Sequence, residues 1–348
     1  MRSFLKPAAG LACLCALAVT GCSSGSGGTA DAAPAAPAAP RQGSASPSPA
    51  AASSASLPSY APYVSATTAA GNDSAGSPRT YNLAFVVSDG GACAPQWDGG
   101  RAIGDAAVKS RIARLKASGA TVRVSFGGAS GKELAATCGS VSELAAAYGE
   151  ALDAAGSSQA DFDIEGDELT DSASVALRSR AIARLQRERP GLSVSFTLPV
   201  MPSGLDADGL ALLESANTYD VQVTTVDIMT MNYGESYDGD MGDYAVTAAK
   251  AAHTQLKKVF GLSDADAWRG MALTSMIGVN DVAGETFTLS DAAQVRSFAR
   301  EKEIAWVSMW SAFRDRQCEK GDASRDDAAT DCSGVRQAPG AFAEVFAG

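Results

Sequence analysis

Eight short apolar runs, rich in β-branched residues, recur from about residue 58 to the end of this 348-residue chain. They are Ala61–Thr67, Tyr81–Val87, Thr121–Gly127, Ala160–Glu165, Leu192–Pro199, Val226–Tyr233, Met271–Ile277 and Ala305–Ser311. Most of the segments between them carry apolar residues at helical spacing. Strands and helices that alternate eight times over about 290 residues match an α/β fold, the (β/α)8 TIM barrel, in number and size.

Five of the intervening segments have a clear helical pattern. The predicted helices are Val108–Ala117, Val141–Leu152, Val175–Gln186, Asp243–Phe260 and Ser290–Glu301, with Ser142, Ser290 and Asp291 as the expected N-terminal caps. The first connection, residues 68–80, is rich in Gly, Ser and Asn and fits the pattern least. A doubly wound open sheet also alternates strands and helices, but no G-x-G-x-x-G loop follows the first strand, so the barrel is favoured.

The first 21 residues have the pattern of a secretion signal. A basic start at Arg2 and Lys6 precedes an apolar run, Leu11 to Val19, that is too short to cross a bilayer as a mature helix. The four residues V-T-G-C that end at Cys22 resemble the lipobox of bacterial lipoproteins, which implies cleavage before Cys22 and diacylation of its thiol. The alternative is an ordinary secretory signal in which Cys22 has no role.

Residues 22–57 are a low-complexity stretch of Ala, Pro, Ser and Gly. The stretch has almost no large apolar residue and cannot bury a core, so we expect a disordered linker ahead of one domain over residues 58–348. We expect the protein to be exported, either to the outer face of the bacterial cell membrane as a lipoprotein or into the medium. The lipid is then its only contact with the membrane.

Four cysteines remain once the signal and Cys22 are set aside: Cys93, Cys138, Cys318 and Cys332. An even number in an exported chain indicates two disulfides. Three connectivities are possible, and we expect the local one, Cys93–Cys138 with Cys318–Cys332.

Charge and histidine content narrow the range of partners. The formal charge of −11 argues against nucleic acid or an anionic membrane surface as the main partner, and it fits a neutral or cationic ligand or simply solubility. The only histidine, His253, lies in a predicted helix, which excludes Ser-His and Cys-His nucleophilic catalysis. Without a second histidine or a C-x-x-C pair we expect no metal site and no cofactor. Separately, we expect the protein to be a monomer.

The run A-D-F-D-I-E at residues 160–165 alternates apolar and acidic residues. As a strand it places Asp161, Asp163 and Glu165 on one face and Phe162 and Ile164 on the other. Like charges at this spacing repel and a buried carboxylate without a partner is costly, so the arrangement indicates chemistry. The three titrations are coupled, and repulsion raises at least one pKa toward the range that a general acid needs.

The same run fits the start of a calcium-binding loop, D-x-D-x-[DN]-G. Its twelfth position is Ser172 rather than the required glutamate, and Phe162 and Ile164 are unsuited to a solvated loop. Catalysis is therefore the better interpretation.

Other polar and aromatic residues occur where predicted strands end, which is where TIM barrels carry their active sites. The third strand ends S-F-G-G (125–128), the sixth ends M-T-M-N-Y-G (229–234), and the eighth reads W-V-S-M-W-S (306–311). They supply a phenol, an amide and an indole around the three acids. Aromatic faces beside paired carboxylates suit a sugar ring, whose C–H face packs on an indole.

These motifs resemble those of family 18 glycoside hydrolases, the chitinases and endo-β-N-acetylglucosaminidases. D-F-D-I-E resembles the core of their D-x-x-D-x-D-x-E signature, S-F-G-G their S-x-G-G strand, and M-N-Y-G their M-x-Y-D strand, while Trp310 matches the tryptophan of their last strand. The segments FVVSDGGACAPQW, MIGVND and SMWSAFRDR are similar to a bacterial chitinase branch common in exported actinobacterial proteins. The resemblance covers the chain from about Pro58 to its end.

The resemblance implies retaining hydrolysis assisted by the substrate. It makes Glu165 the general acid that protonates the glycosidic oxygen, while the N-acetyl oxygen of the substrate attacks the anomeric carbon. Asp163 then orients the acetamido group and stabilises the oxazolinium ion, and Tyr233 holds the acetamide oxygen. Asp161 lies deeper and tunes Asp163.

We expect a substrate-binding set around these residues. Trp310 is the expected pocket floor, with Met231 and Asn232 nearby, and Gly127 gives backbone room for the sugar. Trp97, in the Gly-rich loop after the second strand, is either an outer sugar platform or a packed loop aromatic.

The chain departs from the family pattern at two places. Ser158 and Gln159 stand where the long signature begins Asp-Gly, and Gly234 stands where M-x-Y-D ends, with Asn232 and Glu235 nearby. The expected substrate is a β-1,4-linked N-acetylglucosamine polymer, chitin or chitooligosaccharide. A glycan-binding barrel that does not cleave, and an endo-N-acetylglucosaminidase acting on N-glycans or peptidoglycan, are the alternatives.

Overall fold

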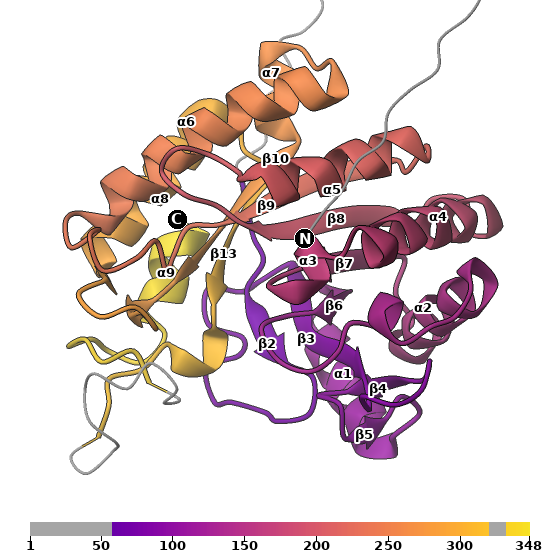
Figure 1. The fold of residues 1–348 in the computed structure, drawn as a ribbon. Coiled ribbons are helices and arrows are strands. Elements are labelled where there is room, and N and C mark those ends of the chain that lie inside the picture. The colour runs from indigo at the N-terminus through magenta and orange to yellow at the C-terminus, as the bar shows by residue number, and fades with distance from the viewer. Residues whose placement is uncertain (1–57, 320–331) are drawn as a thin grey trace, which may run out of the picture. The chain divides into compact units, whose positions relative to one another are not determined.

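Parallel strands form one continuous sheet in the computed structural model, which describes residues 58–319 and 332–348. In sheet order the strands are β1 (Ser59–Tyr60) with β2 (Tyr63–Ser65), β3 (Thr80–Ser88), β6 (Thr121–Gly127), β7 (Gln159–Asp163), β8 (Ser193–Pro199), β9 (Val223–Met229), β10 (Met271–Met276) and β13 (Trp306–Trp310). Each pairs in parallel with its neighbours, and Figure 1 shows β7 and β8 side by side. All eight strands predicted from the sequence are present.

The sheet closes through the first of these strands. β1 pairs with β13, β2 pairs with β3, and only Ala61 and Pro62 separate the two short strands. The ladder continues across this gap, because the Ala61 N–H donates to the Val307 carbonyl (3.0 Å) and the Asn82 N–H donates to the Pro62 carbonyl (2.9 Å). The predicted TIM barrel is thereby confirmed.

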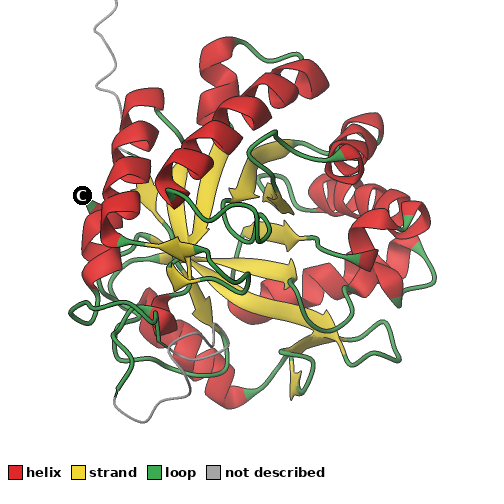
Figure 2. Cartoon of the chain, turned by 60° about the vertical axis from the view of Figure 1, so that its left-hand side comes forward, coloured by secondary structure: helices red, strands yellow, loops and turns green. Residues whose placement is uncertain are grey.

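Helices surround the strands (Figures 1 and 2). They are α1 (Ala106–Lys116), α2 (Val141–Ala155), α4 (Ser172–Glu188), α5 (Ala207–Thr218), α6 (Met241–Phe260), α8 (Leu289–Lys302) and α9 (Ala341–Ala347). The shorter elements are α3 (Asp167–Thr170), α7 (Asp264–Arg269), the 3-10 turns η1 (Leu134–Ala136) and η2 (Ala312–Arg314), and the strands β4 (Pro95–Trp97), β5 (Arg101–Ala102), β11 (Gly278–Val279) and β12 (Thr286–Phe287). The five predicted helices are confirmed, and residues 66–79 contain no helix. The sequence did not predict α5, whose buried stripe is short.

Two of the predicted helix caps are wrong. The side chain that caps α2 is Ser140, which accepts from the Glu143 N–H, rather than Ser142. Thr288, not Ser290, caps α8, and Asp291 completes a capping box with it. In both cases the capping side chain lies directly before the first apolar residue of the helix, Val141 or Leu289, and not within the first turn.

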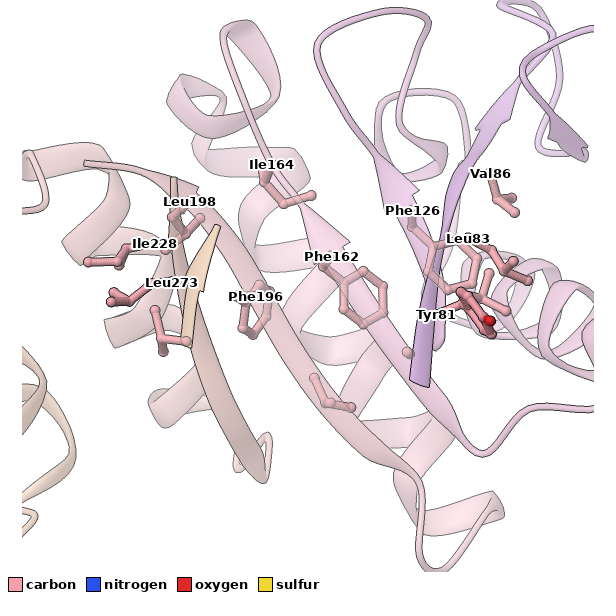
Figure 3. Packing of buried hydrophobic residues seen from close by; sticks show 14 of the residues in the cluster. Tyr81, Leu83, Val86, Phe126, Phe162, Ile164, Phe196, Leu198, Ile228 and Leu273 are labelled. Carbon is pink, nitrogen blue, oxygen red and sulfur yellow. The ribbon is translucent and has the colours of Figure 1, made fainter. Parts of the chain in front are cut away.

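The outward face of β7 packs in an aromatic cluster under the helices. Phe162 stacks on Phe126 of β6 (5.2 Å), lies tilted against Phe196 of β8 (5.7 Å), and meets Tyr148 of α2 edge-on at 5.0 Å. Figure 3 shows Phe126, Phe162 and Phe196 in a row, with Ile164 beyond them. Because side chains alternate along a strand, this packing directs Asp161 and Asp163 to the inside of the barrel.

Both predicted disulfides are confirmed: Cys93–Cys138, with Cα atoms 4.5 Å apart, and Cys318–Cys332, at 5.1 Å. The predicted signal, the lipidation site Cys22 and the linker lie outside the described residues. Within the described part of the chain, none of the helices has the length and apolar character needed to cross a bilayer.

Candidate active site

A cavity of about 620 Å³ lies at the carboxyl ends of the barrel strands. Every strand, or the loop that directly follows it, contributes to the wall. Representative lining residues are Tyr63, Phe85, Gly131, Asp163, Thr197, Met229, Thr274 and Trp310. This is the position that the predicted barrel requires for its active site.

Asp161 lies beneath the cavity as a fully hydrogen-bonded carboxylate. Its Oδ2 accepts from the hydroxyls of Tyr63 (2.9 Å) and Ser125 (2.7 Å), and its Oδ1 accepts from those of Ser195 (2.6 Å) and Thr197 (2.9 Å). Four hydroxyl donors on three strands, β2, β6 and β8, therefore satisfy a carboxylate that is 1% exposed. Its place is fixed, and it cannot turn toward a ligand without breaking several hydrogen bonds.

Asp163, the last residue of the same strand, and Glu165, two residues after its end, line the cavity. Asp163 is 4% exposed, and burial, with repulsion from Glu165, Asp161 and Asp227, raises its pKa well above the usual range. A hydrogen bond between the two carboxyl groups raises the pKa of Asp163 further. Asp163 Oδ1 has no hydrogen-bond partner among the described residues and remains available to a ligand.

Burial also raises the pKa of Glu165. The hydrogen bond from Asp163 opposes this rise and repulsion from Asp281 adds to it. The result is a cavity-lining glutamate that is biased toward its protonated form, which a general acid must be before it can donate.

Trp310 forms an aromatic wall with Phe85, which the sequence analysis missed. The two rings are nearly parallel, with centroids 5.5 Å apart, and Tyr63 and Phe313 meet the indole edge-on. Gly128 is required beside this wall, because a Cβ there would lie 2.8 Å from the Phe85 ring. A flat apolar surface next to two carboxyl groups is therefore built from β3, β13 and the exit of β6.

Known proteins are similar to this chain in sequence and in fold, although no family model matches it. A probable bifunctional chitinase/lysozyme of Escherichia coli is 36% identical over 275 residues, which cover 74% of this chain and 31% of that protein. Endochitinase 11 of Metarhizium anisopliae is 35% identical over 280 residues, 74% of this chain and 52% of that protein. The catalytic domain of a hyperthermophilic chitinase from Pyrococcus furiosus has a TM-score of 0.72 at 29% identity, covering 84% of this chain and 95% of that one.

The barrel is a chitinase-like glycoside hydrolase domain. The enzyme class predicted from the sequence is confirmed. Two solved chitinases described as family 18 members are 13% and 17% identical to this chain and show a similar fold alone. The chain spans less than two thirds of the length of both curated relatives. Its placement in an exported actinobacterial lipoprotein branch stays a prediction.

The hydrolase domain does not bring Tyr233 into its cavity, contrary to the role expected for it. Tyr233 is buried, its ring packs against Tyr237 (5.8 Å) and Tyr244 (6.0 Å), and its hydroxyl has no partner within residues 58–319 and 332–348. Burial and the nearby Glu285 raise its pKa. Met231 and Asn232 line the cavity instead, so the segment M-T-M-N at 229–232 fits the M-x-Y-D pattern two residues earlier than expected.

Trp97 and Gly127 also lie elsewhere than expected. Trp97 is fully buried and its indole N–H donates to the Ile103 carbonyl (3.2 Å), so it is a packed aromatic and not a sugar platform. Gly127 is not in the cavity wall. A Cβ there would collide with the Asp163 carbonyl, so this glycine makes room for β7 rather than for a ligand.

Two carboxylates that were not predicted from the sequence, Asp281 and Glu285, lie on the loop after β10. Asp281 lines the cavity and is bound to Asn232, which has a left-handed backbone (φ 55°). Glu285 is 1% exposed and accepts from the Gly234 N–H at 2.8 Å. In the sequence, the only indication of these carboxylates was Asp281, which ends the segment MIGVND shortly after the seventh predicted strand.

A further buried acid, Asp227 of β9, lies deeper in the barrel. It accepts from the Thr274 hydroxyl (2.8 Å) and the Trp306 indole N–H (3.2 Å), and the Arg123 guanidinium lies over the Trp306 ring at 3.9 Å. Burial and repulsion from Asp161 raise the pKa of Asp227 to about 7. Among the described residues, no group of three or more His, Cys, Asp or Glu side chains is placed to hold a metal ion.

Proposed function

We propose that this domain hydrolyses β-1,4-linked N-acetylglucosamine polymers, chitin or chitooligosaccharides, with retention of anomeric configuration. The observation that carries the proposal is the hydrogen-bonded pair of Asp163 and Glu165 in a cavity walled by Trp310. The names of the relatives point to the same substrate class, as both include chitinase.

In the proposed reaction Glu165 donates its proton to the glycosidic oxygen as the bond between that oxygen and C1 breaks. The acetamide oxygen of the same sugar forms a bond to C1 and gives an oxazolinium ion. Asp163 leaves the proton of their hydrogen bond on Glu165, turns as a carboxylate to accept from the acetamide N–H, and stabilises the oxazolinium ion with its negative charge. Water then attacks C1, Glu165 accepts its proton, and the ring of the oxazolinium opens to the product.

The remaining residues position the substrate. Four hydroxyl groups of neighbouring residues donate to Asp161 and hold it in place. Asp161 thereby fixes the backbone and the charge environment of Asp163. The indole of Trp310 packs against the C–H face of the sugar. Met231 and Asn232 supply the wall that Tyr233 was expected to supply, so we assign no substrate contact to Tyr233.

Hydrolysis is tested by comparing wild type with Glu165→Gln on chitooligosaccharides. We expect kcat to fall by about 10²- to 10⁴-fold, the usual contribution of a general acid. Glu150→Gln, an exposed glutamate on α2, is the matched control and leaves kcat unchanged. If wild type and Glu165→Gln both bind the oligosaccharide and neither cleaves it, the domain is a glycan-binding barrel and the proposal is wrong.

Peptidoglycan is a second candidate substrate, because the name of one relative includes lysozyme. Its glycan chain contains N-acetylglucosamine, which the same mechanism accepts. Parallel assays on chitin, a glycoprotein with N-glycans and peptidoglycan separate the three possibilities by their products.

We also propose that the domain acts outside the cell, attached through Cys22. Two disulfides support this proposal, because they persist in oxidising compartments and are rare in the cytosol. Incorporation of labelled palmitate into wild type but not into Cys22→Ala is the expected result. Equal amounts of both proteins in the medium would point to an ordinary secretory signal.

A further inference from the structure

Carboxylates surround the cavity on several sides. Besides Asp163 and Glu165, it is lined by Asp98 after β4, Asp206 after β8 and Asp281 after β10. No lysine, arginine or histidine within residues 58–319 and 332–348 belongs to the lining. A ligand in this cavity therefore meets a negative potential from loops that follow different strands.

The three outer aspartates are exposed and are not neutralised by ion pairs. None of them takes part in an ion pair with a described lysine, arginine or histidine. The three carboxylates accept hydrogen bonds from uncharged donors: the Phe85 N–H and Thr67 hydroxyl to Asp98, the Gly209 N–H to Asp206, and the Asn232 amide to Asp281. These donors hold each carboxylate in place and leave its charge available to a ligand.

The buried part of the cavity points to a donor-rich ligand as well. Asp163 Oδ1 is buried without a partner and lies in the cavity wall, so a ligand N–H satisfies it. Much of the remaining wall is apolar, with Val87, Met201 and Trp310 among the lining residues.

We infer that this cavity favours partially N-deacetylated chitin, whose glucosamine units carry ammonium groups, over neutral chitin and over anionic muramyl glycans. The inference rests on the proposed function, in which the sugar at the cleaved bond keeps its acetyl group because the acetamide is the nucleophile. The ammonium groups therefore belong to the flanking sugars. Asp98, Asp206 and Asp281 are the residues that recognise them, each from a different loop.

The test compares kcat/KM for fully acetylated chitotetraose and for tetrasaccharides with glucosamine at defined positions, at mildly acidic pH where the amine is charged. We expect the ratio of cationic to neutral substrate to exceed one at low salt and to fall toward one at high salt. Asp98→Asn, Asp206→Asn and Asp281→Asn are each expected to lower this ratio by about two- to fivefold, the range for an exposed charge pair.

The chain offers a matched control for one of these variants. Asp208 lies on the same helix, two residues after Asp206, and is exposed outside the cavity lining, so Asp208→Asn leaves the ratio unchanged. Asn at position 206 preserves the helix cap, because asparagine caps helices as well as aspartate does. A thermal melt of each variant confirms that the fold is intact.

A ratio near one that neither salt nor the three substitutions change overturns the inference, and so does cleavage of peptidoglycan at the rate found for chitotetraose. Failure of the proposed function looks different, because wild type then cleaves none of the tetrasaccharides. In that case calorimetric binding of the acetylated and cationic tetrasaccharides to Glu165→Gln still decides the inference. Equal affinities contradict it, and tighter binding of the cationic ligand supports it.

Discussion

Asn232 and Asp281 hydrogen-bond to each other in both directions. The Asn232 side-chain amide donates to Asp281 Oδ2 (3.0 Å), and the Asp281 N–H donates to Asn232 Oδ1 (3.0 Å). The pair connects the loops after β9 and β10 across the mouth of the barrel. It also fixes the position of a carboxylate whose charge raises the pKa of Glu165.

Removal of this charge lowers the pKa of Glu165. We expect the alkaline limb of the kcat/KM profile to move to lower pH in Asp281→Asn, because Glu165 loses its proton earlier. Asparagine keeps the backbone donor and an oxygen that accepts from Asn232, so the loop stays in place. Asp208→Asn is the control, and a profile that is identical in wild type and Asp281→Asn would show that Asp281 does not act on the acid.

Asp163→Asn is expected to separate activity from stability. The raised pKa of Asp163 in the folded protein means that its contribution to stability is present below the unfolded pKa of about 3.9 and is lost as pH rises through the folded value. At neutral pH the buried, repelled carboxyl is therefore a cost that asparagine removes. We expect hydrolysis to fall by at least about 10²-fold and unfolding free energy to rise by on the order of 1 kcal/mol. Chemical denaturation at neutral and acidic pH measures the second effect, and a less stable variant at neutral pH contradicts it.

The stability of the protein also depends on pH through Asp227, over a pH range that its folded and unfolded pKa values define. Its pKa of about 7 in the folded barrel exceeds the value of about 3.9 expected in the unfolded chain. Its contribution to stability is therefore present below pH 3.9 and is lost between about pH 4 and 7, so Asp227→Asn flattens the fall in stability over that range. The groups that face it are Asp161, Asp163, Arg123 and Tyr63. Melting curves across this range, for wild type and variant, test the expectation.

Trp310→Ala removes the larger half of the aromatic wall. We expect kcat/KM for chitooligosaccharides to fall about tenfold, mainly through KM, because an aromatic contact is worth about 0.5–1.5 kcal/mol beyond the area that it buries. Trp310→Phe keeps a flat apolar face and is expected to restore most of the loss. If Trp310→Ala binds and cleaves as wild type does, the indole is not a sugar-binding surface.

The Cys93–Cys138 disulfide closes a loop of 45 residues that includes the cavity residue Asp98. The double variant Cys93→Ser with Cys138→Ser is expected to lose about 2–4 kcal/mol of unfolding free energy. KM should rise as well, because the loop after β4 is less confined. Thermal denaturation and steady-state kinetics of the variant and of reduced wild type measure the two effects, and unchanged stability in both contradicts the prediction.

The strands could be predicted because their β-branched runs are continuous, and the acidic face of β7 follows from alternation alone. The position of Tyr233 could not. The sequence suggested a strand through Val226–Tyr233, but β9 ends at Met229, the Met231 N–H bonds back to the Met229 carbonyl, and Asn232 turns the chain with a positive φ. The alternation of inward and outward side chains stops there, and Tyr233 packs against Tyr237 and Tyr244 instead of lining the cavity.

Residues set by contacts between distant loops were missed for the same reason. Asp281 enters the site because Asn232, 49 residues earlier, binds it. Trp97 is buried and its indole N–H donates to the Ile103 carbonyl, a contact that the spacing of residues along the sequence does not reveal. Local patterns determine which residues lie on strands, whereas long-range hydrogen bonds decide where the loop side chains point.

Phe162 of β7 and Ile164 directly after it pack outward against aromatic and apolar side chains (Figure 3). Asp161 and Asp163 of β7 face the inside of the barrel and have separate neighbours. An exchange of an inward acid therefore leaves the helix-facing layer untouched. Glu165→Gln, which keeps the size of the side chain, would turn the hydrolase into a stable capture reagent for its glycan. Such a reagent could be immobilised to purify or stain the polymer that the native enzyme degrades.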